Sequence, residues 1–593
     1  MAGQTLAIAN NAIAYIWWRL DAKIDGCLGF SVRRVEANGH KTALPAFVGF
    51  KPGVPGAPRL KKNTDIWPVQ SFQWKDVFAS PGIYSYEIVP MMGPNMEALT
   101  PHPTIKLLTR AVDISGDYGN LEAYFNVGLI STQSITRQLR QLVESGVYAN
   151  KTDALRGEIA KPGSTVRVAL AGEVLDKGVL ALLNKCGGPA GGHCHLGLYE
   201  LTDGQLINAI KTLAAKKRLD LCLSNADQSE SFTGEDGNPH TRKVHDGTNA
   251  AARADLVAQG VPVFNRFVAS SGIGHNKYIV WSRKNGTPRS VLTGSTNWTS
   301  TGLCSQTNNA LLIHNDTVAQ GYRDYWDWLV WDAEQKPVQG KDMREWCGAD
   351  SVDATVGGAS VSVWLSPNTA RRTKDANAAP PDLAEVFELI RQARHGILFL
   401  AFNPGTPSFL DAVRERALAM EAASKPFYVR GAVTAPAPVG EFATFLTKRR
   451  AGAAPDVLVS GVAGVPDDFS FWEEEMYKLG HAVIHDKIIV IDPFTEHSVV
   501  VTGSHNLGYK ASYQNDENLV IVRGHERLAQ AYAAHCLDIT NHFAWRVKLS
   551  DLHRKGKLND AWGDLADTDS WQNKYFDNKN DASRDSFFFF TPP

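Results

Sequence analysis

Hydrophobic and polar positions alternate in two different ways along the chain, and the change falls near residue 129. Before it, short aromatic and β-branched segments, such as 12–21 and 82–91, are separated by clusters of Gly, Pro and Asn. Alternation over segments of this length, closed by turn residues, predicts β-strands. Residues 1–128 are therefore expected to form an all-β sandwich with an accessory role.

From residue 129 onward, short apolar runs alternate with amphipathic segments of helical period. This order predicts an α/β fold with a parallel or mixed sheet. The order occurs twice, so we expect two pseudo-symmetric α/β sandwich halves, at 129–350 and 351–593, with the linker around 348–359. Polar segments at 234–249 and 368–381 are interpreted as loops over a site.

The strongest pattern lies in the second half, between residues 485 and 522. The runs 488–491, 499–501 and 519–522 are short and β-branched, as in strands that are buried on both faces. The polar residues at their ends form the pattern H-x-K-x-x-x-x-D, then G-S-x-N, then Glu, and these are His485, Lys487, Asp492, Ser504, Asn506 and Glu517.

A weaker copy precedes it by 209 or 210 positions. It consists of His275, Lys277, Ser295 and Asn297, with Ser282 in place of the aspartate and Asn308 in place of the glutamate. Residues i and i+2 of a strand point to the same face, so the His and Lys of each motif project together. Two copies related by a pseudo-two-fold axis would surround one centre.

Such a centre suits a phosphodiester. The two lysines would neutralise its non-bridging oxygens, and Asn297 and Asn506 would donate hydrogen bonds to them. One imidazole would attack phosphorus, and the other would protonate the leaving oxygen. Glu517 can orient an imidazole through its Nδ1–H, and the sequence leaves open whether that imidazole belongs to its own half.

Over residues 129–593, the pattern resembles the phospholipase D superfamily of two-motif phosphodiesterases. The resemblance implies a phosphohistidine intermediate, with His275 as nucleophile and His485 as acid. It also implies that Asp492 supports the motif without contacting phosphate, so that Ser282 is tolerated. Ser295, Ser504 and Asn308 are supporting residues. No metal and no cofactor are expected, because the lysines already supply positive charge. Residues 1–128 are similar to an immunoglobulin or fibronectin type III sandwich.

Composition narrows the choice of substrate. The net charge is −1 and the pI is about 7.0, whereas proteins that grip nucleic-acid backbone are more often basic. A phospholipid is thus the first expectation. A metal-independent nuclease of the same superfamily, acting as a toxin or defence effector, is the alternative. A catalytically inactive binding or scaffold protein is the third interpretation.

Seven scattered cysteines and the lack of a transmembrane run indicate a cytoplasmic protein. The N-terminus lacks a basic segment and is expected to form a strand, not a signal peptide, although signal-independent export stays open. The oligomeric state is not indicated.

Two other features are weighed. The segment 186–195, with Cys186, His193, Cys194 and His195, fits no standard zinc spacing, and core thiols beside a loop are favoured. Trp298 and Phe402 end strands near the expected site and are interpreted as core or pocket wall.

Overall fold

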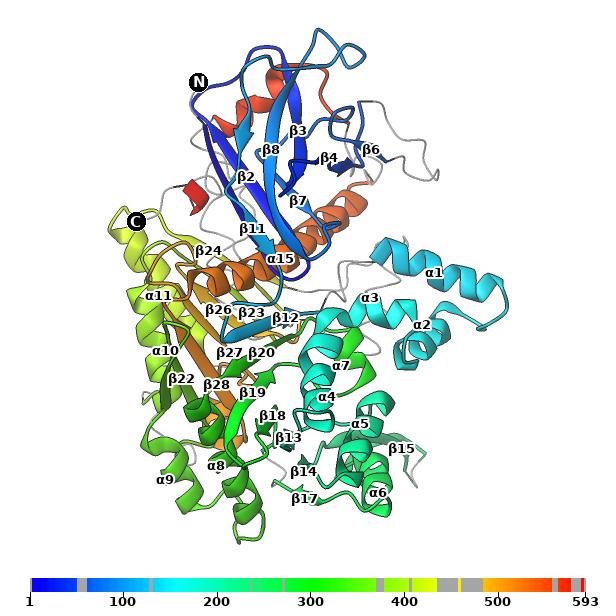
Figure 1. The fold of residues 1–593 in the computed structure, drawn as a ribbon, viewed down its shortest axis with the longest axis vertical. Helices are drawn as coiled ribbons and strands as arrows, with labels where there is room; N and C mark the ends of the chain where they lie inside the picture. The colour runs from blue at the N-terminus through cyan, green and yellow to red at the C-terminus, as the bar shows by residue number, and fades with distance from the viewer. Residues whose placement is uncertain are drawn as a thin grey trace.

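The computed structural model describes residues 3–50, 61–126, 132–234, 237–244, 246–268, 272–369, 378–404, 408–434, 457–459, 484–556, 564–576 and 588–590. Figure 1 shows a β-rich N-terminal part above two α/β parts. The sequence also predicts helices around 441–450 and 471–480, and both lie outside the described residues, as does most of the loop expected at 368–381.

The N-terminal part is built from antiparallel sheets, as predicted. A three-stranded sheet has the order β1-β2-β7, and a six-stranded sheet has β10-β8-β3-β4 with β9 and β11 also on β8. Their strands are β1 Gly3–Ala9, β2 Ala14–Leu20, β3 Cys27–Glu36, β4 Lys41–Ala43, β7 Gln73–Asp76, β8 Gly82–Met92, β9 Thr100–Pro101, β10 Leu107–Leu108 and β11 Val112–Ile114; β5 Pro45–Ala46 pairs with β6 Lys62–Asn63. Trp18 from the first sheet packs edge-on against Phe30 from the second, with ring centroids 5.2 Å apart, so the sheets share one core.

The C-terminal segment closes this sandwich. The 3₁₀ helix η4, Asp569–Tyr575, lies against the β2–β3 connection, where Gln572 exchanges two hydrogen bonds with the backbone of Ile24. Trp571 enters the sandwich core and donates from Nε1 to the Cys27 carbonyl at 2.9 Å. Phe588 and Phe589, near the end of the chain, are also buried.

Truncating Trp571 tests this closure. Its ring is 8% exposed, so Trp571→Ala leaves a large cavity and should lower the free energy of unfolding of the sandwich by about 3–5 kcal/mol. The measurement is chemical denaturation followed by far-UV circular dichroism. Phe78→Ala, at a sandwich position that is 52% exposed, is the matched control and should cost less than about 1 kcal/mol. Equal losses in both variants would contradict docking of the tail.

The first α/β half contains a seven-stranded mixed sheet of order β12-β20-β19-β18-β13-β14-β17. Its strands are β12 Leu121–Phe125, β13 His193–Leu198, β14 Leu219–Ser224, β17 Val263–Arg266, β18 Lys277–Ser282, β19 Pro288–Gly294 and β20 Asn309–His314. Its helices are α1 Thr132–Glu144, α2 Lys151–Ala160, α3 Thr165–Glu173, η1 Val174–Leu180, α4 Ala181–Gly187, α5 Gly204–Ala215, α6 Ala250–Ala258, α7 Ser300–Cys304, α8 Asp316–Ala333 and α9 Lys341–Ala349.

The second half repeats this order and adds one edge strand: β21-β22-β28-β27-β26-β23-β24-β25. Its strands are β21 Val352–Val356, β22 Ala359–Leu365, β23 Gly396–Ala401, β24 Tyr428–Val433, β25 Val457–Val459, β26 Lys487–Ile491, β27 Val499–Gly503 and β28 Asn518–Arg523. Its helices are α10 Pro381–Gln392, α11 Phe409–Ala422, α14 Tyr509–Gln514 and α15 Glu526–Arg554. The matching orders confirm the expected α/β fold of two similar halves.

Three local expectations are corrected. β12 lies within the residues assigned to the sandwich, but it pairs antiparallel with β20 and so belongs to the first α/β sheet. The expected linker at 348–359 contains β21, which pairs with β22, so the connection between the sheets narrows to the residues between α9 and β21. The expected loop at 234–249 begins in a hairpin whose strands are β15 Gln228–Thr233 and β16 Pro239–Val244.

Both sheets are buried on both faces, because their strands alternate between two cores. In β18, Tyr278 and Val280 belong to the core between the halves, whereas Ile279 belongs to the outer core of the first half. Helices α8 and α15 contribute side chains to the core between the halves. Asp538 of α15 accepts hydrogen bonds from Tyr15 and Lys75 of the sandwich, at 3.0 and 2.9 Å. None of the described helices combines the length and apolar character needed to cross a membrane.

Candidate active site

Backbone hydrogen bonds join the two halves directly at the motifs. The amide of His275 donates to the Asp516 carbonyl at 2.8 Å, and the amide of His485 donates to the Thr307 carbonyl at 3.1 Å. Each bond lies in a short parallel bridge between the segment before one motif and the segment before β28 or β20 of the other half. The residue after each carbonyl, Glu517 or Asn308, is thereby brought next to the histidine of the opposite half.

The two imidazoles face each other across this junction. Their ring centroids are 6.3 Å apart, the rings are inclined by 74°, and each residue is 4% exposed. The Nδ1 atom of His275 lies 3.0 Å from Glu517 Oε2, and that of His485 lies 2.9 Å from Asn308 Oδ1. Glu517 therefore reaches across to the first half, which answers the question that the sequence leaves open.

Both orienting groups are themselves fixed. Asn515 donates from its amide to Glu517 Oε1 at 2.8 Å. Ser295 donates to Asn308 Oδ1 at 2.8 Å, and the Asn308 amide donates to the Gly302 carbonyl. Because these oxygens accept hydrogen bonds, each imidazole presents an Nδ1–H to its partner, which leaves the lone pair of a neutral ring on Nε2.

The two serines of the G-S-x-N segments play equivalent supporting parts. The Ser295 hydroxyl accepts the backbone N–H of Asn309 at 3.1 Å, and the Ser504 hydroxyl accepts that of Asn518 at 3.0 Å. Each serine thus holds the start of the strand that follows Asn308 or Glu517. Both are fully buried.

The residue between His and Lys in each motif links the halves, a role the sequence analysis missed. Asn518 donates to Asn276 Oδ1 at 3.1 Å, and Asn309 donates to Asp486 Oδ1 at 2.8 Å. Asp486 also contacts His535 of α15 at 2.9 Å. The signal was available, since NDEN at 515–518 and QTNN at 306–309 occupy the same place in the repeat.

Asp492 supports the fold at a distance from the histidines. Its carboxylate accepts the backbone N–H groups of Arg394, His395 and Gly396 at 2.8–2.9 Å, and so holds the start of β23. It follows the last residue of β26, whereas His485 and Lys487 lie at the beginning of that strand. The corresponding Ser282 is buried, and within the described residues its hydroxyl has no hydrogen-bond partner.

The lysines are buried beside the histidines. Each Nζ donates to the carbonyl of the histidine in its own motif at 2.6 Å. Lys277 lies over the ring of Tyr199 and Lys487 over that of Phe402, with Nζ 5.2 and 5.3 Å from the ring centroids. The same rings contact the imidazoles, Tyr199 to His275 at 5.1 Å and Phe402 to His485 at 5.3 Å. Phe402 is thus a wall of the site.

Trp298, the other aromatic residue considered, lies in the outer core of the first half. Tyr199 was missed. It could have been found by aligning the ends of β13 and β23, because Leu198 pairs with Lys277 as Ala401 pairs with Lys487. The next residues in the chain are Tyr199 and Phe402.

A carboxylate also stands at the site, next to Tyr199. Asn297 donates from Nδ2 to Glu200 Oε2 at 2.6 Å. The corresponding position of the second half, after Phe402, is Asn403. The first half thus holds a negative charge near the lysines that the second half lacks, and the sequence analysis did not identify it. Within the described residues, Oδ1 of Asn297 and Oδ1 of Asn506 are buried without hydrogen-bond partners.

Burial controls the proton affinities of the site. It lowers the pKa of His275 to about 4, against the opposing charge of Glu517. Burial, reinforced by the charge of Lys487, holds the pKa of His485 well below its usual value. Burial likewise lowers the pKa of both lysines. Burial alone would raise the pKa of Glu517, but the charge and hydrogen bond of His275 bring it below its usual value.

The sequence matches the family described as "Cardiolipin synthase, PLD-like domain" over residues 181–330 and 470–538. No curated protein matches it. Phosphatidylserine synthase from Haemophilus influenzae Rd KW20 is 12% identical and has a TM-score of 0.40, with 65% of this chain and 92% of that chain covered. The phospholipase D family member Nuc from Salmonella typhimurium is 17% identical over 31% and 95% of the chains, with a TM-score of 0.20. Yeast tyrosyl-DNA phosphodiesterase is 9% identical over 59% and 88%, with a TM-score of 0.32.

The two matched segments contain both histidines, both lysines, both asparagines and the crossed partners Glu517 and Asn308. They also contain the strands on which these residues meet. The match therefore identifies a phospholipase D-like domain in residues 181–330 and 470–538, shared between the two α/β halves.

Proposed function

We propose that the protein cleaves or transfers a phosphodiester through a phosphohistidine on His275, most readily on a phospholipid. The observation that carries the proposal is the crossed pairing of two facing imidazoles, one with a carboxylate and one with an amide. Two chemically distinct imidazoles 6.3 Å apart suit a reaction that needs one nucleophile and one acid.

The pairing also supports the division of roles. A nucleophilic imidazole gains positive charge as its Nε2 bonds to phosphorus, and Glu517 can stabilise that charge through Nδ1–H. The acid must release a proton, and the neutral Asn308 does not add to its proton affinity. The low pKa of His275 keeps its ring neutral, and therefore nucleophilic, above about pH 4.

In the first step, His275 Nε2 forms a bond to phosphorus as the bond to the leaving oxygen breaks, and His485 gives that oxygen its proton. In the second step, His485 takes a proton from water or an alcohol, whose oxygen bonds to phosphorus and displaces His275. A bound phosphate anion opposes the lysine charges, and so restores to His485 the proton affinity that the acid needs.

The phosphate would be held by the lysine ammonium groups and by the amides of Asn297 and Asn506. Because one N–H of Asn297 is directed to Glu200, the second N–H of that amide remains for the phosphate. Within the described residues, the amide of Asn506 makes no hydrogen bond to a carboxylate, so the two asparagines are not equivalent.

Charge supports a phospholipid over a nucleic acid. Binding of a nucleic-acid backbone relies on many lysines and arginines, whereas here Glu200 and Glu517 stand beside the two lysines. Tyr199 and Phe402 offer apolar surface next to the phosphate position. The family that matches the sequence is described by a phospholipid synthase.

The decisive test is cleavage in chelator of fluorescent phosphatidylcholine vesicles, of single-stranded DNA and of duplex DNA. Lipid cleavage by the wild-type chain and by His314→Asn, but not by His485→Ala, is expected. His314 is a matched control because it pairs with Glu122 outside the site. Cleavage of DNA alone would replace the substrate assignment. Identical traces for wild type and His485→Ala on every substrate would indicate an inactive binding protein.

The pH dependence follows from the pKa shifts. The folded pKa of His275 is lowered, so the neutral nucleophile is present above about pH 4 and is lost as the pH falls through that value. The pKa values of both lysines are also lowered. The lysines therefore lose their positive charge as the pH rises, at a pH below the ordinary lysine pKa. We expect kcat/KM for a soluble short-chain phosphodiester to fall at both ends.

Lys277→Arg should move the alkaline limb to higher pH, because a guanidinium keeps its charge. An acid limb near the ordinary histidine pKa of about 6.5 would contradict the assigned burial effect on His275.

A further inference from the structure

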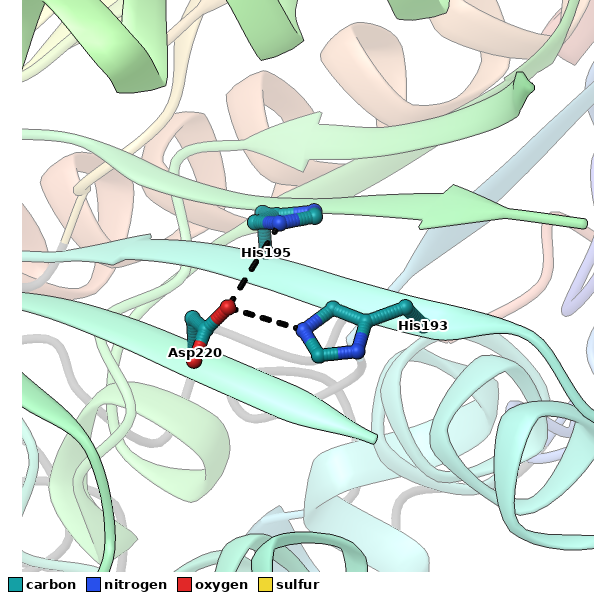
Figure 2. Close-up of side chains that lie close together, drawn as sticks. All are labelled: His193, His195 and Asp220. Carbon is teal, nitrogen blue, oxygen red and sulfur yellow. Dashed lines mark hydrogen bonds and ion pairs between the residues drawn. The ribbon is translucent and has the colours of Figure 1, made fainter. Parts of the chain in front are cut away.

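A second group of potential ligands lies on the first α/β sheet, apart from the histidine pair of the active site. Strands β13 and β14 are parallel neighbours, and His195 is in register with Asp220. His193 precedes His195 by two residues and therefore projects from the same face of β13. The strand geometry thus brings two imidazoles and one carboxylate together, as Figure 2 shows.

The distances match those of a metal centre. Asp220 Oδ2 lies 2.9 Å from His193 Nε2 and 3.7 Å from His195 Nε2. One ligand atom from each of the three residues lies within 4.8 Å of the others. Tetrahedral Zn²⁺ with bonds of about 2.1 Å places its ligand atoms about 3.4 Å apart. Shifts of about 0.3–0.5 Å would bring the two Asp220 distances to that value, and the two imidazoles would have to close further around the ion.

His195 supplies an independent observation. Its side chain is nine-tenths buried, yet it makes no hydrogen bond to any residue that the structure describes, and its Nδ1 is fully enclosed. Its Nε2 lies 3.7 Å from Asp220 Oδ2, beyond hydrogen-bond distance. The Nε2 atom of His195 faces Asp220 without a hydrogen bond to it, and coordination of a metal there would give this nitrogen a partner.

The cysteines of the same segment do not belong to this group. Cys194 lies between the two histidines in sequence, so its side chain points to the opposite face of β13, into the outer core beside Cys186. The sequence had placed all four residues together as core thiols and a loop. The structure separates the two thiols from the two imidazoles and adds Asp220, which lies 25 positions after His195.

The surroundings contain one opposing charge. Arg323 of α8 lies near the group, but its guanidinium is directed to Asp327 at 2.5 Å and lies over the Trp326 ring. Trp326 in turn packs edge-on against His195, with ring centroids 5.0 Å apart. His193 and Asp220 are about one-third exposed at their side chains, which leaves a path for an ion from solvent.

We propose that His193, His195 and Asp220 bind one Zn²⁺, with water completing the tetrahedron. Two imidazoles and a carboxylate are a ligand set that zinc accepts. The ion would tie the beginning of β13 to β14. The end of β13 carries Tyr199 and Glu200, about 20 Å away at the rise of a strand, so the ion would stabilise the strand that bears part of the active site and would take no part in the reaction.

The test is titration of the chelator-treated, full-length protein with Zn²⁺ by isothermal titration calorimetry, together with visible absorption of the Co²⁺-substituted protein. We expect one ion per chain and the d–d bands of tetrahedral Co²⁺. His193→Ala and the isosteric Asp220→Asn should each weaken binding by roughly 100-fold. Thermal denaturation with Zn²⁺ should raise the melting temperature of the wild type but not of Asp220→Asn.

Zn²⁺ could also bind the two active-site imidazoles, and His485→Asn separates that case. This variant should retain the ion and the Co²⁺ spectrum if the proposal is correct. Loss of binding in His485→Asn with retention in Asp220→Asn would overturn it. So would the absence of binding to the wild type at micromolar free Zn²⁺, which would leave His193 and Asp220 as an ordinary hydrogen-bonded pair. Circular dichroism of each variant in chelator checks that the fold is intact.

Discussion

Replacing His275 with alanine is expected to abolish turnover, with a loss in kcat on the order of 10⁶-fold. The variant removes the group that we propose bonds to phosphorus, and the lysines and asparagines that remain can bind a phosphodiester but cannot form a covalent intermediate. On a substrate with a good leaving group, His485→Ala should be less severe, at about 10²–10⁴-fold, because such a group needs no proton to leave. Substrate binding should change little in either variant.

The two effects are separated by trapping. A reaction with ³²P-labelled substrate is quenched, and the stability of the labelled protein in acid and in base is measured. The labelled peptide is then identified by mass spectrometry. With a substrate that carries an activated aryl leaving group, His485→Ala should accumulate base-stable, acid-labile label on His275. The label persists because the second step needs His485 as its base. Label on His485 in His275→Ala would reverse the assigned roles. His314→Asn again serves as the control for a histidine outside the site.

Much of this site could be predicted because its elements are local in sequence. The apolar runs of β26, β27 and β28 are each five or six residues long and buried at nearly every position, so their ends, with His485, Lys487, Ser504 and Glu517, are marked by a change from apolar to polar residues. The repeat then gave the same positions in the first half. Helix α11 was nevertheless missed, although Ser408 and Asp411 form a capping box at its start.

The crossed pairing could not be predicted, because it depends on how the two halves meet. Glu517 is 32 positions from His485 and 242 from His275, and it binds the more distant of the two. The exchange follows from two short parallel bridges between the halves, which bury Asp516 and Thr307 without any local pattern. For the same reason, the contact between His195 and Asp220 could not be predicted, because the register of two parallel strands is set only once the helix between them has packed.

Replacing Glu517 with glutamine is the second large effect that the site predicts. Glutamine has nearly the same shape, but it carries no charge and can turn an N–H toward His275 Nδ1, which then favours the wrong tautomer. A carboxylate-to-amide change at such a position can lower kcat by about 10⁴-fold. Asn515 donates to Oε1, whereas His275 lies at Oε2. Asn515 therefore holds the glutamine oxygen away from His275 and the NH2 group toward it, so replacing Asn515 by alanine as well should recover part of the activity.

Asn308→Asp is the matched change in the other half, and it should act in the opposite sense. A carboxylate on His485 Nδ1–H raises the pKa of this imidazole, so the acid keeps its proton to higher pH and the alkaline limb of the kcat profile moves upward. Glu517→Gln should instead lower kcat across the whole profile, because it removes the charge that stabilises the phosphohistidine. The measurement is kcat against pH for both variants, with the unfolding free energy of each as a check on the fold. If Asn308→Asp reduced kcat as strongly as Glu517→Gln and left the alkaline limb in place, the two imidazoles would be equivalent and the assignment of His275 as nucleophile would be wrong.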